Sequence, residues 1–262
     1  GIGTTNPDPA VGAGNTAKLS VGILSAYQLY GDGSGLTNVG GGSTDGWIQD
    51  SQGNLFAGTA AGAARDADTC FNIGIGQSAG KALNEGDSNI FLGCFAAPAV
   101  TSGSGNLAIG EKAGELWETA SQSIAIGYRA GSETATNSNN NIFLGTCAGR
   151  YSRGHNNVYI GRCANAAGTN YGSSSVIIGA WAGSCNGSGE NTYVGGGAGY
   201  YSKGQFNTLL GYYAGGRACG SYCSTWVGAY SGCGTGTEAN YTGDCNVGMG
   251  NRAGRGMTSG HS

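Results

Sequence analysis

The chain has 262 residues, and 55 of them are glycine, about 21% against a usual share near 7%. Only 10% of the residues are charged and the formal net charge is −3, so the basic surface of a nucleic-acid-binding protein is absent. Few prolines and no Gly-X-Y register exclude collagen, and no apolar run reaches the ~18 residues of a membrane-spanning helix. We therefore expect neither a nucleic-acid partner nor insertion into a membrane.

Residues 1–50 precede the repetitive part of the chain and are expected to form an adaptor or linker. The stretch AKLSVGILSAYQLY at 17–30 alternates apolar and polar residues, which predicts one or two short strands. GDGSG at 31–35 predicts a tight turn. Because residue 1 is glycine and no signal peptide is recognisable, we expect a processed or partial chain.

Residues 51–256 consist of copies of one short unit, and 257–262 form a short C-terminal tail. Representative copies read NIFLGTCAG, SVIIGAWAG and NTLLGYYAG. From the first anchor glycine to the last, 192 residues pass in eleven steps, a mean of about 17.5 residues. A flexible glycine-rich linker would not keep this register. The anchor glycines are Gly58, Gly76, Gly93, Gly110, Gly127, Gly145, Gly161, Gly179, Gly195, Gly211, Gly228 and Gly250.

Each position of the unit has a physical interpretation. Asn or Ser stands four residues before every anchor, which predicts a ladder of side chains between stacked copies. The residues three and one before the anchor are mostly aliphatic, such as Ile124 and Ile126, and share one face of a short strand. We interpret these residues, some 24 in all, as the inward-facing core, and the residue between each pair as outward-facing. The anchor glycine indicates a positive φ or a close approach by a neighbouring coil.

A unit with one short strand cannot bury its apolar face alone, but stacking copies about 4.8 Å apart does so. The predicted fold class is therefore all-β: a repeat β-solenoid or β-roll of about twelve coils of ~17 residues. Lateral association with other copies would add to the stability of so glycine-rich a rod.

Two segments together resemble a known family. GIGTTNP at 1–7 and GDGSGLTNV at 31–39, followed by the NxxIGxxAG repeats, resemble tail-fibre and related fibrous virion proteins of bacteriophages, especially cyanophages. Similar segments occur in bacterial proteins with a carboxyl-terminal chaperone peptidase, and we expect that such a domain was cleaved off or never existed. The repeats are more loosely similar to the heads of trimeric autotransporter adhesins, although the unit here is longer.

The resemblance implies a homotrimeric fibre in a virion or in the extracellular space. Its N-terminal segment would contact other virion tail proteins, and the fibre would reach host surface glycans or proteins. The expected function is thus that of a structural tail-fibre protein. A bacterial extracellular adhesin or filament protein shares these repeats and stays open. A fibre-borne glycan hydrolase also stays open, because carboxylates of different coils can converge in space.

We expect no enzyme and no cofactor, because the chemical signals are sparse. His155 stands alone in a loop, and acidic residues such as Asp66 and Asp87 are scattered without a paired pattern. No repeated cysteine pair has zinc-finger spacing, and the calcium-binding rolls need recurrent aspartates that this unit lacks. Neither metal is expected.

Two cysteine pairs occupy matching positions of adjacent units. Cys147 and Cys163 follow their anchors by two residues, and Cys223 and Cys245 precede theirs by five. Neighbouring coils about 4.8 Å apart lie within the ~4.4–6.8 Å Cα range of a disulfide. Each pair is a candidate inter-coil disulfide; the alternative is a pair of reduced, packed thiols.

Aromatic residues gather within or just after the GxxAG turns of the carboxyl-terminal half. They are candidates for a recognition surface, because aromatic platforms beside Asn and Ser suit the faces of sugars or another protein. The alternative is that they fill grooves between coils or between subunits. The candidate residues are Tyr151, Trp181, Tyr200, Tyr201, Tyr212 and Tyr213.

Overall fold

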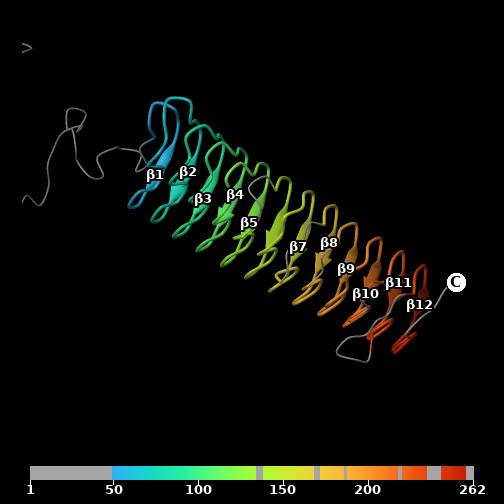
Figure 1. The fold of residues 1–262 in the computed structure, drawn as a ribbon. Helices are drawn as coiled ribbons and strands as arrows, with labels where there is room; N and C mark the ends of the chain where they lie inside the picture. The colour runs from blue at the N-terminus through green and yellow to red at the C-terminus, as the bar shows by residue number, and fades with distance from the viewer. Residues whose placement is uncertain are drawn as a thin grey trace, which may run out of the picture. The chain divides into compact units, whose positions relative to one another are not determined.

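The computed structural model describes residues 49–133, 138–167, 172–185, 188–217, 220–234 and 243–257, and these form a β-solenoid built on one parallel sheet (Figure 1). The predicted fold class is confirmed. Nearly all of the expected adaptor 1–50, its GDGSG turn and the tail beyond residue 257 lie outside the described residues. No helix long and apolar enough to cross a membrane occurs within those ranges.

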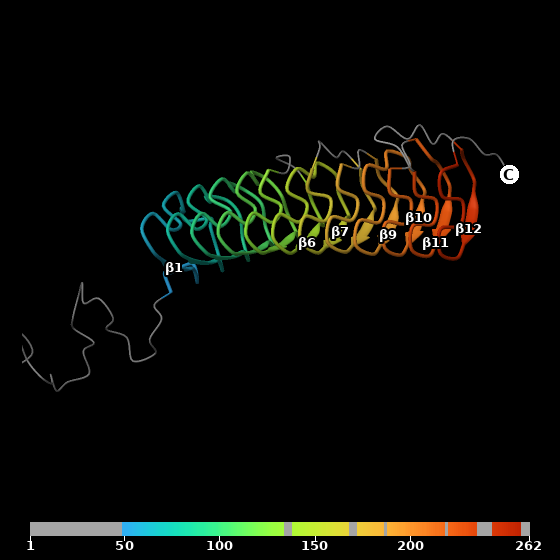
Figure 2. The ribbon, with the colours of Figure 1, turned by 90° about the horizontal axis from the view of Figure 1, so that it is seen from below.

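The sheet has twelve strands, one from each repeat unit, and every strand consists of three residues. They stack in sequence order, each hydrogen-bonded in parallel to the next, so that successive coils lie side by side (Figure 2). The strands are β1 (Leu55–Ala57), β2 (Ile73–Ile75), β3 (Ile90–Leu92), β4 (Leu107–Ile109), β5 (Ile124–Ile126), β6 (Ile142–Leu144), β7 (Val158–Ile160), β8 (Val176–Ile178), β9 (Thr192–Val194), β10 (Thr208–Leu210), β11 (Thr225–Val227) and β12 (Val247–Met249).

The register follows the repeat without a slip. Each strand ends at the residue before an anchor glycine, and equivalent residues of adjacent units are partners, for example Ala125 and Phe143 of β5 and β6. The turn after the strand closes when the N–H three residues beyond the anchor donates to the anchor carbonyl, as Ala148 does to Gly145 at 3.1 Å. The periodicity therefore predicted both the strand positions and their pairing.

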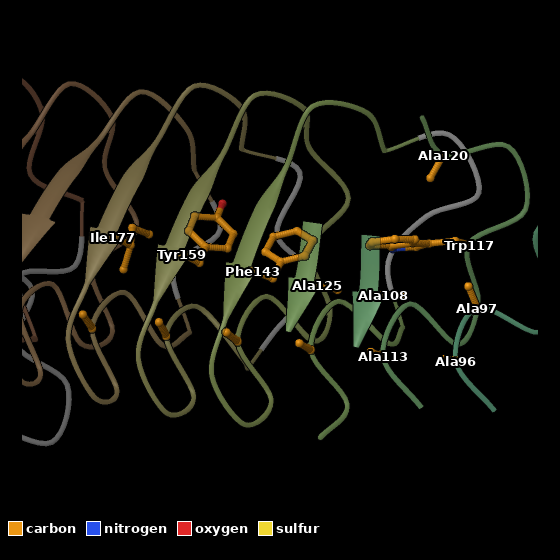
Figure 3. Packing of buried hydrophobic residues seen from close by; sticks show 14 of the residues in the cluster. Ala96, Ala97, Ala108, Ala113, Trp117, Ala120, Ala125, Phe143, Tyr159 and Ile177 are labelled. Atoms are coloured by element: carbon orange, nitrogen blue, oxygen red, sulfur yellow. The ribbon is translucent and has the colours of Figure 1, made fainter. Parts of the chain in front are cut away.

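The core lies on the opposite side of the sheet from the one that we predicted. The middle residue of most strands is buried: Phe143, Tyr159 and Ile177 have no exposed surface and project from successive strands on the same side (Figure 3). The flanking aliphatic residues are half-buried or exposed, and Ile126 keeps 37% of its surface. The prediction that the 24 flanking residues face inward and the aromatic column outward is wrong.

Steric volume explains this reversal. Alternation shows which residues share a face of a strand, but not which face points into the coil. A coil of ~17 residues encloses little space, and the buried alanines three residues beyond the anchors, such as Ala113 and Ala130, already occupy one side of it. One strand side chain per layer fills the remainder, where two branched aliphatic side chains would not fit.

From β6 to β11 every strand contributes a large side chain to the interior, whereas in the first coils small strand residues are combined with large side chains from nearby. β4 and β5 contribute only Ala108 and Ala125, and the buried ring of Trp117, from the turn of the same region, lies beside Ala108 (Figure 3). In the first coils, Gly74 of β2 leaves room for the ring of Phe56, because a Cβ at position 74 would collide with that ring. The core is thus a single column of interlocking layers.

The predicted Asn/Ser ladder is confirmed and runs through all twelve coils. The side chain of each ladder residue except the last accepts a hydrogen bond from the backbone N–H of the ladder residue in the next coil, for example Asn89 N–H to Asn72 Oδ1 at 2.8 Å. Serine does the same with its hydroxyl, since Asn141 N–H donates to Ser123 Oγ at 3.2 Å. The ladder is buried and consists of Asn54, Asn72, Asn89, Asn106, Ser123, Asn141, Asn157, Ser175, Asn191, Asn207, Ser224 and Asn246.

Candidate functional site

Aromatic side chains of consecutive turns meet on one side of the carboxyl-terminal coils. Tyr200 lies edge-on to Tyr201, with ring centroids 4.5 Å apart, and 6.2 Å from Tyr213. Tyr212 and Tyr213 also meet edge to face, at 4.8 Å. Trp181, Tyr200 and Tyr213 line one shallow cavity of about 190 Å³. Together with Tyr230, these residues form what we call the tyrosine cluster: Trp181, Tyr200, Tyr201, Tyr212, Tyr213 and Tyr230.

Tyr230 belongs to the cluster although we did not predict it. Its ring stacks on that of Tyr213 at 5.9 Å with planes 11° apart, and it meets Tyr212 edge to face at 5.5 Å. Tyr213 and Tyr230 both stand two residues beyond an anchor, in adjacent units. The alignment of units that paired the cysteines therefore also places Tyr230 beside Tyr213 and could have predicted their contact.

Several members of the cluster present their rings to solvent. Tyr212 is 53% exposed, Tyr201 43% and Trp181 39%. Their neighbours also affect their ionisation: Tyr230 is the main cause of a raised pKa at Tyr212, and a hydrogen bond with Tyr200 is the main cause of a raised pKa at Tyr201. Because even an unshifted phenol is protonated at neutral pH, both residues keep an O–H donor beside an apolar ring.

Two guanidinium groups adjoin the rings. Arg217 and Arg255 line a second cavity of about 360 Å³, together with Tyr212, Tyr213 and Tyr230. The Arg255 guanidinium lies over the Tyr230 ring, 5.4 Å from its centroid. Planar cations beside exposed aromatic rings form a surface that accepts both an apolar sugar face and a carboxylate or phosphate.

Tyr151 does not join the cluster. Its partner is Arg150, whose guanidinium lies 4.9 Å from the ring centroid and also donates to Glu133 at 2.9 Å. Trp181 carries a cation of its own, since Arg162 lies 5.2 Å from its ring centroid. Of the six predicted aromatic residues, the structure thus gathers Trp181, Tyr200, Tyr201, Tyr212 and Tyr213 and leaves Tyr151 apart.

The two matched cysteine pairs are neighbours, and the structure holds them as thiols. Burial is the main cause of a raised pKa at the Cys163 thiol. The adjacent Cys147, to which this thiol is hydrogen-bonded, raises the pKa further. The pKa of Cys223 is likewise raised by desolvation and then by Cys245, with which it shares a hydrogen bond. Each pair is therefore placed for the predicted disulfide, which stays a prediction. Cys219 lies outside the described residues.

Mild oxidation of the folded protein is expected to link Cys147 to Cys163 and Cys223 to Cys245. Each bond closes a loop of about one coil, which in the chain-entropy model stabilises a protein by about 3 kcal/mol. Mass spectrometry of a non-reducing digest detects both cross-linked peptides, and Cys147→Ser removes only the first. Unlinked peptides at both pairs after oxidation would show that the thiols do not face each other.

His155 and Asp87 have structural partners in the loops that lead into the strands, three residues before β7 and β3 begin. Both stand six residues before an anchor and accept a hydrogen bond from the backbone of the preceding coil: Asn139 N–H donates to His155 Nδ1 at 3.1 Å, and Cys70 N–H to Asp87 Oδ1 at 2.8 Å. The same bond recurs in the coils between these two residues: Asp87 N–H donates to Ser104 Oγ at 3.0 Å, and Ser104 N–H donates to Ser121 Oγ at 3.2 Å. A second, outer ladder therefore holds the loop edge of the coils together.

Comparison with known proteins returned no similarity: no protein-family model, curated protein or solved structure matches the chain. Within the described ranges, no three His, Cys, Asp or Glu side chains gather in a way that could hold a metal ion. The tyrosine cluster, with its two arginines, is accordingly the strongest candidate site that the geometry offers.

Proposed function

We propose that this protein is a structural segment of a phage tail fibre or similar virion fibre, which extends toward a host cell and contacts its surface glycans. The observation that carries this proposal is the unbroken parallel sheet, with one strand per unit and no slip of register. Eleven steps of about 4.8 Å give a distance of about 53 Å between β1 and β12. Such an element serves as a spacer rather than as a container for a substrate.

The mechanical part of the proposal rests on two sets of hydrogen bonds that run along the rod. The Asn/Ser ladder ties every pair of coils internally, while the outer ladder of Asp87, Ser104 and His155 ties the loop edge. Because each coil contacts only its neighbours, a force applied along the rod is transmitted in full through each of the successive, nearly identical interfaces. Three copies side by side, as the resemblance implies, would stiffen the fibre further.

The adhesive part rests on the tyrosine cluster. Exposed rings of Tyr212 and Trp181 offer apolar platforms for the C–H faces of sugars, and tyrosine hydroxyls supply donors. Arg217 and Arg255 favour a saccharide that carries a carboxylate or phosphate. The ligand class that this surface suits best is therefore an acidic surface polysaccharide.

Immunoelectron microscopy tests the assignment to a virion. Antibodies raised against the purified chain are expected to label the tails of phage particles in cultures that produce this protein. Labelling of the bacterial cell surface in place of particles would overturn the virion assignment and support the extracellular adhesin or filament protein instead.

Binding to acidic polysaccharides is expected to depend on the tyrosine cluster. Tyr212→Ala and Trp181→Ala each remove an exposed platform and should weaken binding on a glycan array about tenfold, whereas Arg255→Gln should weaken binding of acidic sugars alone. Tyr222→Ala is the matched control, because Tyr222 is 42% exposed and precedes its strand, whereas the cluster residues all follow their anchor glycines. Equal binding by all four variants would exclude the cluster as the contact surface.

A further inference from the structure

The outer side of the sheet carries an apolar surface that the described residues leave uncovered. It consists of the first and third residues of β1 to β12, and we call it the aliphatic face. None of these 24 residues is buried: each is half-buried or exposed, and Ile90, Val176 and Val194 each keep 37% of their surface.

The chemistry of this face is uniform along the whole rod. Twenty-one of the 24 residues are Ile, Leu, Val, Ala or Met, the others are Thr192, Thr208 and Thr225, and none is charged. Twelve strands at about 4.8 Å and three residues at about 3.3 Å give a projected area of about 570 Å². That figure reaches the upper end of the ~300–600 Å² found for the largest apolar patch of a monomer, even before the ridges of the side chains are counted.

We propose that the aliphatic face is the surface through which copies of this chain associate. A second copy presents the same rows of side chains at the same ~4.8 Å period, so ridges and grooves of the two faces remain in step over all twelve strands. A partner without this period loses register within a few strands. The occupant that the geometry fits is therefore the chain itself.

The area is sufficient for a stable interface. Two such faces in contact bury more than the ~1,000 Å² that distinguishes a biological interface, and they do so without burying a charge. A hydrated glycan is a poor occupant, because only three threonine hydroxyls stand among 24 side chains to orient it. The inference deepens the fibre assembly proposed above and rests on it for the number of copies.

Light scattering on the chain of 262 residues tests this interface. The unaltered protein is expected to have a mass that is a multiple of 26.0 kDa. Ile126→Glu combined with Val176→Glu places two carboxylates on the face and should return a mass of 26.0 kDa with an unchanged far-ultraviolet circular dichroism spectrum. Leu116→Glu is the control, because Leu116 is 50% exposed but lies outside the strands, and it should keep the multimer.

A second series keeps the proposal testable if the glutamate variant fails to fold. Threonine is native at the first position of β9, β10 and β11, so Ile124→Thr, Ile142→Thr and Val158→Thr introduce a residue that this column tolerates. Combined, they should weaken self-association at least about tenfold, whereas Thr192→Val, Thr208→Val and Thr225→Val together should strengthen it.

The outcomes separate the interface from the assembly. If the unaltered protein is a multimer and both series leave its mass and affinity unchanged, the copies associate elsewhere, so the aliphatic face is not the interface although a fibre assembly stands. If the unaltered protein has a mass of 26.0 kDa, the self-association itself is overturned, whether the face is then covered by residues 1–48 or by another protein.

Discussion

Asn106→Ala is expected to lower the free energy of unfolding by about 2–6 kcal/mol, because it removes a buried side chain of the Asn/Ser ladder that both accepts and donates a hydrogen bond. Asn106 is 2% exposed; its Oδ1 accepts from Ser123 N–H at 3.0 Å, and its Nδ2 donates to the Ala120 carbonyl at 2.6 Å. Alanine leaves that donor and that acceptor buried without their partner, at about 1–3 kcal/mol each. Chemical denaturation at a fixed protein concentration measures the loss, since self-association would make the midpoint concentration-dependent.

Asn106→Ser provides the graded comparison. Serine is native at three rungs and its hydroxyl still accepts the N–H of the next coil, as Ser175 Oγ does from Asn191 at 3.2 Å. The acceptor is therefore kept, while the bond from Nδ2 to Asn89 Oδ1 is lost. The bond to the Ala120 carbonyl is replaced by a longer one of the kind that Ser123 Oγ makes to the Ser138 carbonyl at 3.3 Å, so a smaller loss of about 1–3 kcal/mol is expected. Asn251→Ala, at an exposed asparagine outside the ladder, should change stability by less than about 0.5 kcal/mol. If Asn106→Ala lowers the free energy of unfolding as little as Asn251→Ala does, the hydrogen bonds of the ladder do not stabilise the rod.

The repeat made most of the fold predictable. Strands of a solenoid coincide with the positions at which the pattern repeats, so the anchors alone placed β1 to β12, and the fixed Asn or Ser before each strand predicted the ladder. These features depend on equivalent residues meeting in adjacent coils, which a register of eleven steps specifies.

The direction of each face was not predictable in the same way. Ile124 and Ile126 are more hydrophobic than the Ala125 between them, yet Ala125 points inward, because the space inside the coil and the bulk of Trp117 and Phe143 decide which side chain fits. Hydrophobicity ranks residues for burial in general. It does not reveal that a second apolar face remains on the outside of the same sheet.

The candidate site shows a similar division. Five of the six predicted aromatic residues meet because they fall in the turns of adjacent coils, which the register implies. Arg217 and Arg255 stand six and five residues beyond their anchors, at positions where most other copies carry other residues, so periodicity carried no signal for the two cations. The repeat therefore predicted the aromatic part of the site but not its two arginines.

Gly127→Ala is expected to destabilise the rod by more than about 4 kcal/mol, for two independent reasons. Gly127 has a φ of +129°, a conformation that strains any residue with a Cβ by about 1–3 kcal/mol. In addition, a Cβ at this position would lie 2.8 Å from the carbonyl carbon of Gly145, so the backbones of two coils would have to separate. Denaturation measures the total, and hydrogen exchange of β5 and β6 locates the opening between these strands.

Gly250→Ala separates these two reasons. Gly250 is the last anchor, its φ is +115°, and no atom lies within 4 Å of the position that its Cβ would take. This variant therefore carries the backbone strain without the collision, and it should lose only about 1–3 kcal/mol. If Gly127→Ala and Gly250→Ala prove equal, the anchor column is glycine for its conformation alone; a larger loss at Gly127 shows that glycine also allows the coils to approach as closely as they do.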